Sequence, residues 1–224
     1  MTYQLYSISG APRPWRVMLG LLAKGLDFEL HTLDASNKEH KAPAFLALNP
    51  RGRVPVLNSG ELVVTESLAI LAYLEKQHPH PPLFGSTAEE HAAIWQLVSE
   101  GEHYVNDATS SLLNPLFFQG KDDTDGEVQR GATAVREEMR RLDGLLARSR
   151  FLAGERMTAA DCVCFPHARL VLRATERFPD VTRRLELHPF ERAFPHLAQW
   201  IARVETLPGY MKTFPPHWKA ARTD

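Results

Sequence analysis

The clearest chemical pattern in the chain is the run from Asn49 to Leu57, in which a proline separates two valines in Val54-Pro55-Val56. Proline has no backbone N–H to give to a neighbouring strand, so the run predicts a strand entered through a cis proline bond. We expect this bend to leave the backbone groups of Val54 without strand partners. An extended peptide can add to such an edge as an extra strand, held by main-chain hydrogen bonds. The run therefore predicts a site for a small peptide-like ligand.

A second pattern begins nine residues after Leu57, where Glu66-Ser67 precedes apolar residues at helical spacing. This spacing predicts that Glu66 and Ser67 lie in the first turn of a helix. The N–H groups of a first turn have no intrahelical acceptors and attract carboxylates.

Together these motifs resemble the glutathione-binding half of the cytosolic glutathione transferase family, and the likeness runs through most of the chain. The resemblance implies that Pro55 is cis and that the backbone of Val54 pairs with the cysteinyl part of glutathione. It also implies that Glu66 and Ser67 hold the γ-glutamyl end. The basic residues that it places at the glycyl end are Lys41, Arg53 and, less directly, His40.

Members of this family activate the glutathione thiol with a hydroxyl group near the start of the first helix. A thiol with a pKa of about 8.5 is mostly protonated at neutral pH, whereas a hydrogen bond and a helix N-terminus favour the thiolate. Bacterial and plant members have a serine five residues before the Arg of Arg-Val, but here that position holds Ala11. The predicted catalytic residues are therefore Ser9, through its hydroxyl, and Arg13, through its permanent positive charge. The alternatives are Ser7 and Tyr6.

Hydrophobic periodicity and turn residues predict the elements that position these groups. Strands are expected at 4–8, 28–33, 54–57 and 62–64, and helices from Trp15 to Gly25, at 44–48 and at 66–77. With the resemblance, this order predicts an α+β thioredoxin-like domain (βαβ-α-ββα) over residues 1–78. The proline-rich stretch Pro79 to Pro82 lies in a predicted linker at 79–88.

Residues 89–224 are predicted to form an all-α helical bundle that carries the electrophile site. Thr158 and Asp161 form a capping-box pattern with aspartate in place of glutamate, and its expected role is structural. The stretch 112–120 is expected to connect two helices, and a tail containing Trp218 is expected to pack back on the protein. The candidate electrophile-site residues are Tyr104, Asn106, Phe117 and Phe118.

The composition excludes several other classes of function. A net charge of −1 over 224 residues gives no strong field for nucleic acid, and the sequence has no apolar run of membrane-spanning length. Cys162 and Cys164 give no metal-ligand set and are expected to be core thiols. We therefore expect no metal, no nucleic-acid partner and no membrane association, with a cytoplasmic location.

The resemblance implies a homodimer that conjugates, or reduces with, glutathione at a small apolar electrophile. Two alternatives remain open at this point. The first is a non-catalytic member of the same fold, which Ala11 favours and Glu66-Ser67 disfavours. The second is a maleylacetoacetate-type isomerase, whose Ser-Ser-Cys loop is replaced here by Ala11-Pro12-Arg13.

Overall fold

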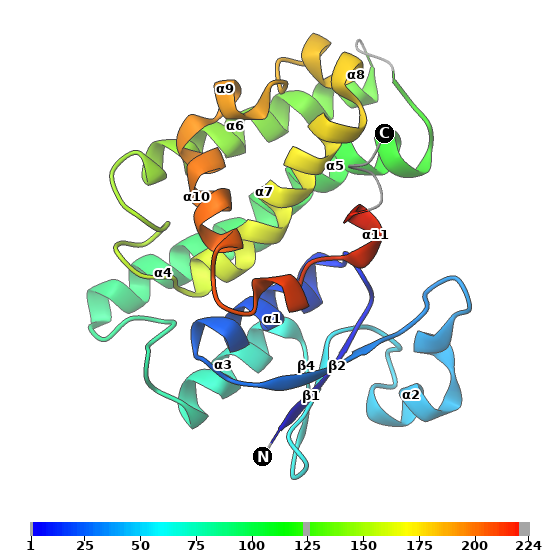
Figure 1. The fold of residues 1–224 in the computed structure, drawn as a ribbon, viewed down its shortest axis with the longest axis vertical. Helices are drawn as coiled ribbons and strands as arrows, with labels where there is room; N and C mark the ends of the chain where they lie inside the picture. Colours follow the sequence, from blue (N-terminus) through cyan, green and yellow to red (C-terminus); the bar gives the residue numbers. More distant parts are fainter. Residues whose placement is uncertain (1, 123–125, 220–224) are drawn as a thin grey trace. The chain divides into compact units, whose positions relative to one another are not determined.

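The computed structural model describes residues 2–122 and 126–219. The chain divides into two compact units, the first running to Phe84 and resuming at Leu207, and the second running from Gly85 to Thr206 (Figure 1). Our sequence-based boundaries assigned the whole of 89–224 to the helical domain. The segment from Leu207 belongs with the first unit instead, because its side chains pack against Trp15.

The first unit contains a four-stranded mixed sheet in the order β2-β1-β3-β4. Strand β1 pairs in parallel with β2 and antiparallel with β3, which places Leu5 beside both Leu30 and Leu57. Tyr3, Leu5 and Ser7 are the buried residues of β1, as expected for a strand with one face on the core. The strands are β1 (Tyr3–Ser7), β2 (Phe28–Thr32), β3 (Val56–Asn58) and β4 (Val63–Thr65).

Helices interrupt the strands in the predicted βαβ-α-ββα order, which confirms the thioredoxin-like fold of the first unit. Helices α1 and α3 pack closely at Gly20, where an added Cβ atom would clash with Leu71 Cδ2. Glycine at this position therefore allows the two helices to approach. The helical elements of this unit are α1 (Pro12–Ala23), η1 (Glu39–Lys41), α2 (Pro43–Leu48), α3 (Ser67–Gln77), η3 (Tyr210–Lys212) and α11 (Pro216–Lys219).

The C-terminal segment returns to α1, as Figure 1 shows, and there it contacts Trp15. The indole Nε1 of Trp15 donates a buried 3.0 Å hydrogen bond to Thr213 Oγ1. The ring of Trp218 meets the Trp15 ring edge-on, with centroids 5.4 Å apart, and Phe214 packs against both indoles. These contacts explain why the segment joins the sheet unit, and they confirm that the tail with Trp218 packs back.

The second unit is helical throughout its regular elements, as predicted. Helix α4, the π-helical turn η2 and helix α5 follow one another without a break in the chain. The expectation that 112–120 connects two helices was wrong, since α5 extends to Phe118 with Pro115 inside it. The elements are α4 (Ala88–Glu100), η2 (Gly101–Val105), α5 (Asn106–Phe118), α6 (Glu127–Leu146), α7 (Ala159–Arg177), α8 (Pro179–Arg184), α9 (Phe190–Ala193) and α10 (Pro195–Glu205).

The reason for this error is the packing of α5 against α6. A proline inside a helix removes the hydrogen bond to the carbonyl four residues earlier, which here is that of Ser111. Gly131 of α6 lies against this same carbonyl, and a Cβ atom there would be 2.7 Å from Ser111 O. Because Leu112 and Leu116 are also buried, the tertiary contacts favour helix through the proline.

The predicted capping box at the start of α7 is present. The carboxylate of Asp161, 0% exposed, accepts hydrogen bonds from the backbone N–H and the hydroxyl of Thr158 at 2.9 and 3.0 Å. It also accepts from Leu152 N at 2.9 Å and from Trp200 Nε1 at 3.0 Å. Burial raises the pKa of Asp161, and these four donors oppose that rise. The box therefore ties the start of α7 to α10 and to the preceding loop.

Candidate functional site

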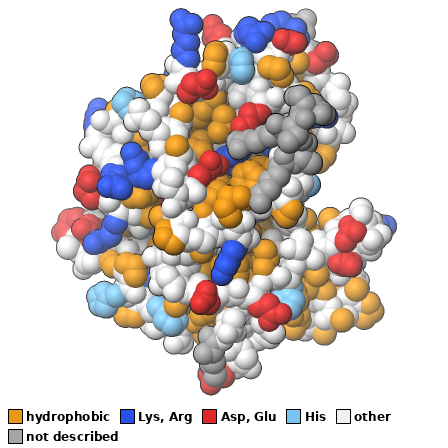
Figure 2. Space-filling model, viewed as in Figure 1, with side chains coloured by type: hydrophobic (Ala, Val, Ile, Leu, Met, Phe, Trp, Pro, Cys, Tyr) orange, Lys and Arg blue, Asp and Glu red, His pale blue; other side chains and the backbone are white. Residues whose placement is uncertain are grey.

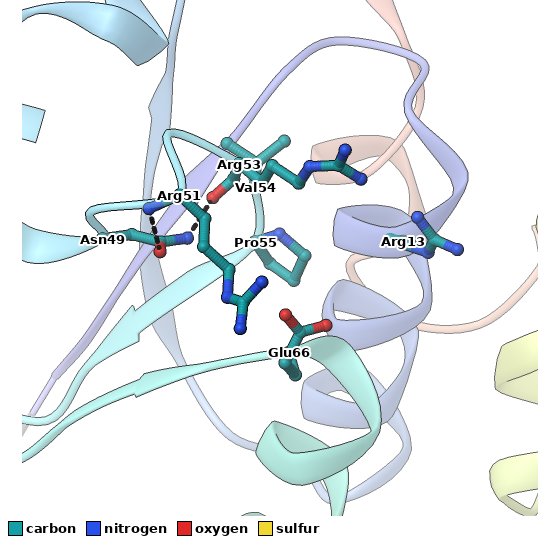
Figure 3. Close-up of a pocket in the computed structure, with 7 residues that line it drawn as sticks. All are labelled: Arg13, Asn49, Arg51, Arg53, Val54, Pro55 and Glu66. Carbon is teal, nitrogen blue, oxygen red and sulfur yellow. Dashed lines mark hydrogen bonds between the residues drawn. The ribbon is translucent and has the colours of Figure 1, made fainter. Parts of the chain in front are cut away.

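Charged side chains of the first unit line a cavity of about 250 Å³, shown in Figure 3. Helix α1, the loop between α2 and β3, and the residue before α3 all contribute to its wall. Three of the lining side chains are guanidinium groups and one is a carboxylate. The lining residues are Arg13, Asn49, Arg51, Arg53, Val54, Pro55 and Glu66.

Asn49 organises the loop that carries two of these arginines. Its side-chain amide donates a 2.7 Å hydrogen bond to the carbonyl of Arg53, and its side-chain oxygen accepts from the N–H of Arg51 at 3.1 Å (Figure 3). Asn49 is only 4% exposed, whereas Arg51 and Arg53 are exposed. The buried amide therefore presents two guanidinium groups at the cavity. Neither Asn49 nor Arg51 was predicted to be a site residue, although Asn49, three residues before Gly52, is a recognisable turn signal.

Lys41 supports the same loop from the other side. Its ammonium donates to the carbonyls of Arg51 at 3.2 Å and Gly52 at 2.9 Å, so the structure gives it a loop-holding role. Gly52 has φ +57, and a Cβ atom there would lie 2.7 Å from the carbonyl of His40 and from Lys41 Nζ. Neither Lys41 nor His40 lines the cavity. The predicted glutathione contacts at these two positions stay predictions, and their observed contacts are with the loop.

Val54 and Pro55 form one wall of the cavity, and the peptide bond between them is cis. Strand β3 begins two residues after Val54, at Val56, where its pairing with β1 also begins. We had expected the strand to start at Val54. The backbone of Val54 thus lies at the cavity and ahead of the sheet's paired residues, as a β-adding ligand requires.

Glu66 has an unusual backbone conformation, with φ +66 and ψ 117. Non-glycine residues rarely adopt positive φ, and such positions concentrate at functional sites. Its exposed carboxylate faces the cavity, and Figure 3 shows the Arg51 side chain extending toward it. Ser67 follows as the first residue of α3, is 4% exposed and does not line the cavity.

Helix α1 brings Arg13 to the opposite wall. Proline occupies positions 12 and 14, so Arg13 is the one residue of the first three in α1 with a backbone N–H. The N-cap is Ala11, whose side chain has no hydrogen-bonding atom. The N-terminus of α1 therefore offers a helix dipole, one N–H and an arginine side chain to a bound anion.

The three hydroxyl candidates differ in their surroundings. Ser9 lies in the turn before Ala11, and its Oγ is 3.2 Å from Nδ1 of His217 in the C-terminal segment. Ser7 is 2% exposed and donates to the carbonyl of Ile8 at 3.3 Å. Tyr6 stacks on His31 with ring centroids 4.8 Å apart, which agrees with a half-buried strand aromatic. None of these three is among the lining residues of the cavity.

The candidate electrophile residues belong to the second unit. Tyr104 is 64% exposed in the π-helical turn, and Phe118 is 82% exposed at the end of α5. Phe117 packs edge-on against Phe178, with ring centroids 5.0 Å apart. Asn106 donates to the neighbouring carboxylate of Asp107 at 3.0 Å.

Figure 2 shows acidic and basic side chains interspersed over the visible face of the described residues. Within residues 2–122 and 126–219, no three His, Cys, Asp or Glu side chains are grouped as metal ligands require. None of the helices in that same part of the chain is long and apolar enough to cross a membrane. Cys162 and Cys164 are buried in α7, as expected of core thiols.

Comparison with known proteins finds relatives that align with most of the chain. The family model "Glutathione S-transferase, N-terminal domain" matches residues 1–76, and the model "Glutathione S-transferase, C-terminal domain" matches residues 125–203. Glutathione S-transferase 3 of Zea mays is 31% identical over 219 residues, covering 94% of this chain and 92% of its own. Maleylacetoacetate isomerase of Pseudomonas aeruginosa is 32% identical over 210 residues, covering 86% and 95%. The crystal structure of a glutathione S-transferase from the Antarctic clam Laternula elliptica has a TM-score of 0.82 at 29% identity, covering 100% of this chain and 96% of that chain.

Proposed function

The chain belongs to the glutathione S-transferase family, and on this premise we propose that its arginine-lined cavity binds glutathione and activates the thiol through Arg13. The activated sulfur would then attack a small apolar electrophile. The observation that carries this proposal is the convergence of Arg13, Arg51 and Arg53 with Glu66 beside Val54.

The charges of the cavity complement those of glutathione. Glutathione carries two carboxylates and one ammonium, and its thiolate form adds a further negative charge. Three guanidinium groups and one carboxylate supply the opposite set of charges. Because guanidinium groups bind carboxylates through paired, charge-assisted hydrogen bonds, this wall suits a ligand with two carboxylates.

The parts of the ligand can be assigned along the cavity wall. The carboxylate of Glu66 would accept hydrogen bonds from the ammonium of the γ-glutamyl end, while Ser67 and the first-turn amides of α3 hold its carboxylate. The N-cap Glu66 makes no side-chain capping bond among the described residues, so the first turn of α3 keeps amides for a ligand. Arg53, supported by Arg51, would pair with the glycyl carboxylate. Val54 would exchange backbone hydrogen bonds with the cysteinyl residue.

Arg13 would stabilise the thiolate in place of the family's hydroxyl group. The thiolate would lie at the N-terminus of α1, where the helix dipole and the Arg13 backbone N–H both favour an anion. The guanidinium adds a permanent charge that cannot be lost by deprotonation. Ser9, in the turn preceding the helix, is the second candidate and would act through its hydroxyl.

A maleylacetoacetate-type isomerization is the second candidate function. The observation in its favour is the similarity to the Pseudomonas aeruginosa isomerase over 86% of this chain. The Ser-Ser-Cys loop typical of maleylacetoacetate-type isomerases is replaced here by Ala11-Pro12-Arg13, which argues against this function. The homodimer stays a prediction from the resemblance, and the cytoplasmic location and the electrophile-site residues stay predictions from the sequence.

The experiment that tests the proposal measures the thiolate absorbance of enzyme-bound glutathione as a function of pH. Wild-type protein should bind glutathione saturably and lower the pKa of its thiol below that of free glutathione. Arg13→Ala should shift this pKa back toward the free value and slow conjugation of chlorodinitrobenzene about tenfold, the effect of losing one charged hydrogen bond. Arg183→Ala, which removes an exposed arginine of α8, is the control and should change neither. Absence of glutathione binding in the wild type would overturn the proposal.

A further inference from the structure

Ser9 and His217 lie 208 positions apart in the sequence but form a hydrogen-bonded pair. The Oγ atom of Ser9 is 3.2 Å from Nδ1 of His217. Ser9 precedes the N-cap Ala11 by two residues, so the pair lies at the entrance to α1. A residue from the C-terminal segment thus reaches the loop in which this family holds its sulfur-activating hydroxyl.

The position of His217 is fixed by its neighbours in α11 and by α1. Trp218 is 4% exposed and meets the Trp15 indole edge-on at 5.4 Å. Five residues before Trp218, Thr213 accepts the buried hydrogen bond from Trp15 Nε1. Trp15 therefore contacts the segment on both sides of Pro215. His217 lies in α11, which these contacts hold against α1.

The imidazole also lies against the backbone of the loop. A Cβ atom on Gly10 would be 3.5 Å from Cε1 of His217 and 3.5 Å from Cζ2 of Trp218, which is ordinary van der Waals contact. Gly10 has φ +79, a conformation that glycine adopts readily. The turn at Ser9-Gly10 and the ring of His217 are thus packed together, and the hydrogen bond is part of this packing.

The direction of this hydrogen bond decides what Ser9 can do. A serine hydroxyl has one hydrogen and two acceptor lone pairs. If Nδ1 of His217 accepts, the hydroxyl hydrogen is used within the protein. If Nδ1 carries the hydrogen and donates it to Oγ, the hydroxyl hydrogen is left for a ligand. Only the second arrangement lets Ser9 donate a hydrogen bond to a thiolate.

We propose that His217 is a positioning residue that donates its Nδ1–H to Ser9 and so directs the Ser9 hydroxyl hydrogen to the glutathione sulfur. The inference rests on the proposed function, since it requires glutathione to bind with its sulfur near the start of α1. In this arrangement the thiolate receives a hydrogen bond from Ser9 on the loop side and the charge of Arg13 on the helix side. No proton leaves His217 or Ser9 in the process.

Two substitutions at position 217 separate this role from packing. His217→Phe keeps a ring against Gly10 and Trp218 but has no hydrogen-bonding atom, whereas His217→Asn keeps an N–H donor close to the Nδ1 position. His217→Phe and Ser9→Ala should each raise the pKa of the bound thiol and slow chlorodinitrobenzene conjugation about tenfold. The double variant should be no slower than either single variant, because both remove the same hydrogen bond to sulfur. His217→Asn should retain most of the activity.

Met211→Ala serves as the control within the same segment, since Met211 is 57% exposed and should change neither readout. The Trp15–Trp218 contact makes tryptophan fluorescence a measure of whether the segment stays docked in each variant. An unchanged thiol pKa in His217→Phe, equal losses in His217→Phe and His217→Asn, or additive losses in the double variant would each overturn the inference while the proposed function stands. A wild-type protein that binds no glutathione would overturn both.

Discussion

The side-chain amide of Asn49 donates a 2.7 Å hydrogen bond to the carbonyl oxygen of Arg53, the residue immediately before Val54. This bond, made by a nearly buried side chain, fixes the backbone from which the Arg53 guanidinium reaches the cavity. Asn49, for which no ligand contact was predicted, thus controls the position of Arg53, which was predicted to bind glutathione. The ligand site therefore depends on a supporting amide as well as on its charged groups.

Substitution at Asn49 should weaken glutathione binding through the loop. Asn49→Asp keeps the acceptor for the Arg51 N–H but places a carboxylate oxygen against the Arg53 carbonyl, so one of two bonds is lost. We expect the dissociation constant to rise about tenfold and the free energy of unfolding to fall by about 1 kcal/mol. Calorimetric titration and urea unfolding measure the two effects. Asn58→Asp, at an amide that bonds Gln4 and Gly60 away from the cavity, should lower stability without changing binding.

Arg51 is expected to contribute to binding mainly through its charge. Arg51→Ala should weaken glutathione binding about tenfold at low salt, with a smaller difference from wild type at high salt, because exposed charges are screened. Lys76→Ala removes one positive charge from the exposed end of α3 in the same unit and tests for a general effect of net charge. Equal losses in the two variants would contradict a direct role for Arg51 in the cavity.

Glu66 should show opposite effects on stability and on binding. Its φ of +66 carries a backbone strain on the order of 1–3 kcal/mol, which glycine would relieve in part. Glu66→Gly is therefore expected to raise the free energy of unfolding by about 1 kcal/mol while weakening glutathione binding about tenfold. Lys38→Gly, at another positive φ of +58, should not affect binding. A Glu66→Gly protein that is less stable than wild type would contradict the strain argument.

Ser67→Ala tests the γ-glutamyl end of the predicted site. The hydroxyl of this serine at the start of α3 is expected to bond the γ-glutamyl carboxylate. Its loss should weaken glutathione binding by roughly 1 to 3 kcal/mol, the range for a hydrogen bond to a charged group. Ser59→Ala removes a similarly buried hydroxyl that bonds Leu62 and should leave the affinity unchanged. Unchanged affinity in Ser67→Ala would show that this residue is not part of the site.

Asp161 should be among the most sensitive positions for folding and neutral for chemistry. Asp161→Ala leaves Trp200 Nε1 and the Leu152 N–H buried without this acceptor, and it removes the half of the capping box in which the Asp161 carboxylate accepts from Thr158. We expect a loss of about 3 kcal/mol in the free energy of unfolding. Asp180→Ala removes an aspartate whose side chain is 81% exposed and should cost well under 1 kcal/mol. A small effect of Asp161→Ala would show that the second unit does not depend on this box.

The sequence alone determined those features that depend on neighbouring residues. The helical spacing after Ser67, the capping box at Thr158 and the Val54-Pro55-Val56 run are local patterns, and each lies where its pattern predicts within a residue or two. Local conformational preferences act over a few residues, so the folded protein retains them where the packing of the core favours the same conformation. The βαβ-α-ββα order, by contrast, was predicted from these local elements together with the resemblance to a known family.

Tertiary structure decided the rest, because those features depend on which distant segments pack together. Lys41 donates to the carbonyls of Arg51 and Gly52 instead of lining the cavity, and the spacing of these residues in the sequence does not predict this contact. Helix continues through Pro115 since α6 packs beside it, overriding a local helix-breaking signal. The return of His217 to Ser9 is the longest-range case. This contact depends on the aromatic packing of Trp15 against Trp218. Hydrophobic periodicity can predict that Trp15 lies on the buried face of a helix, but it cannot predict which distant segment packs on that face.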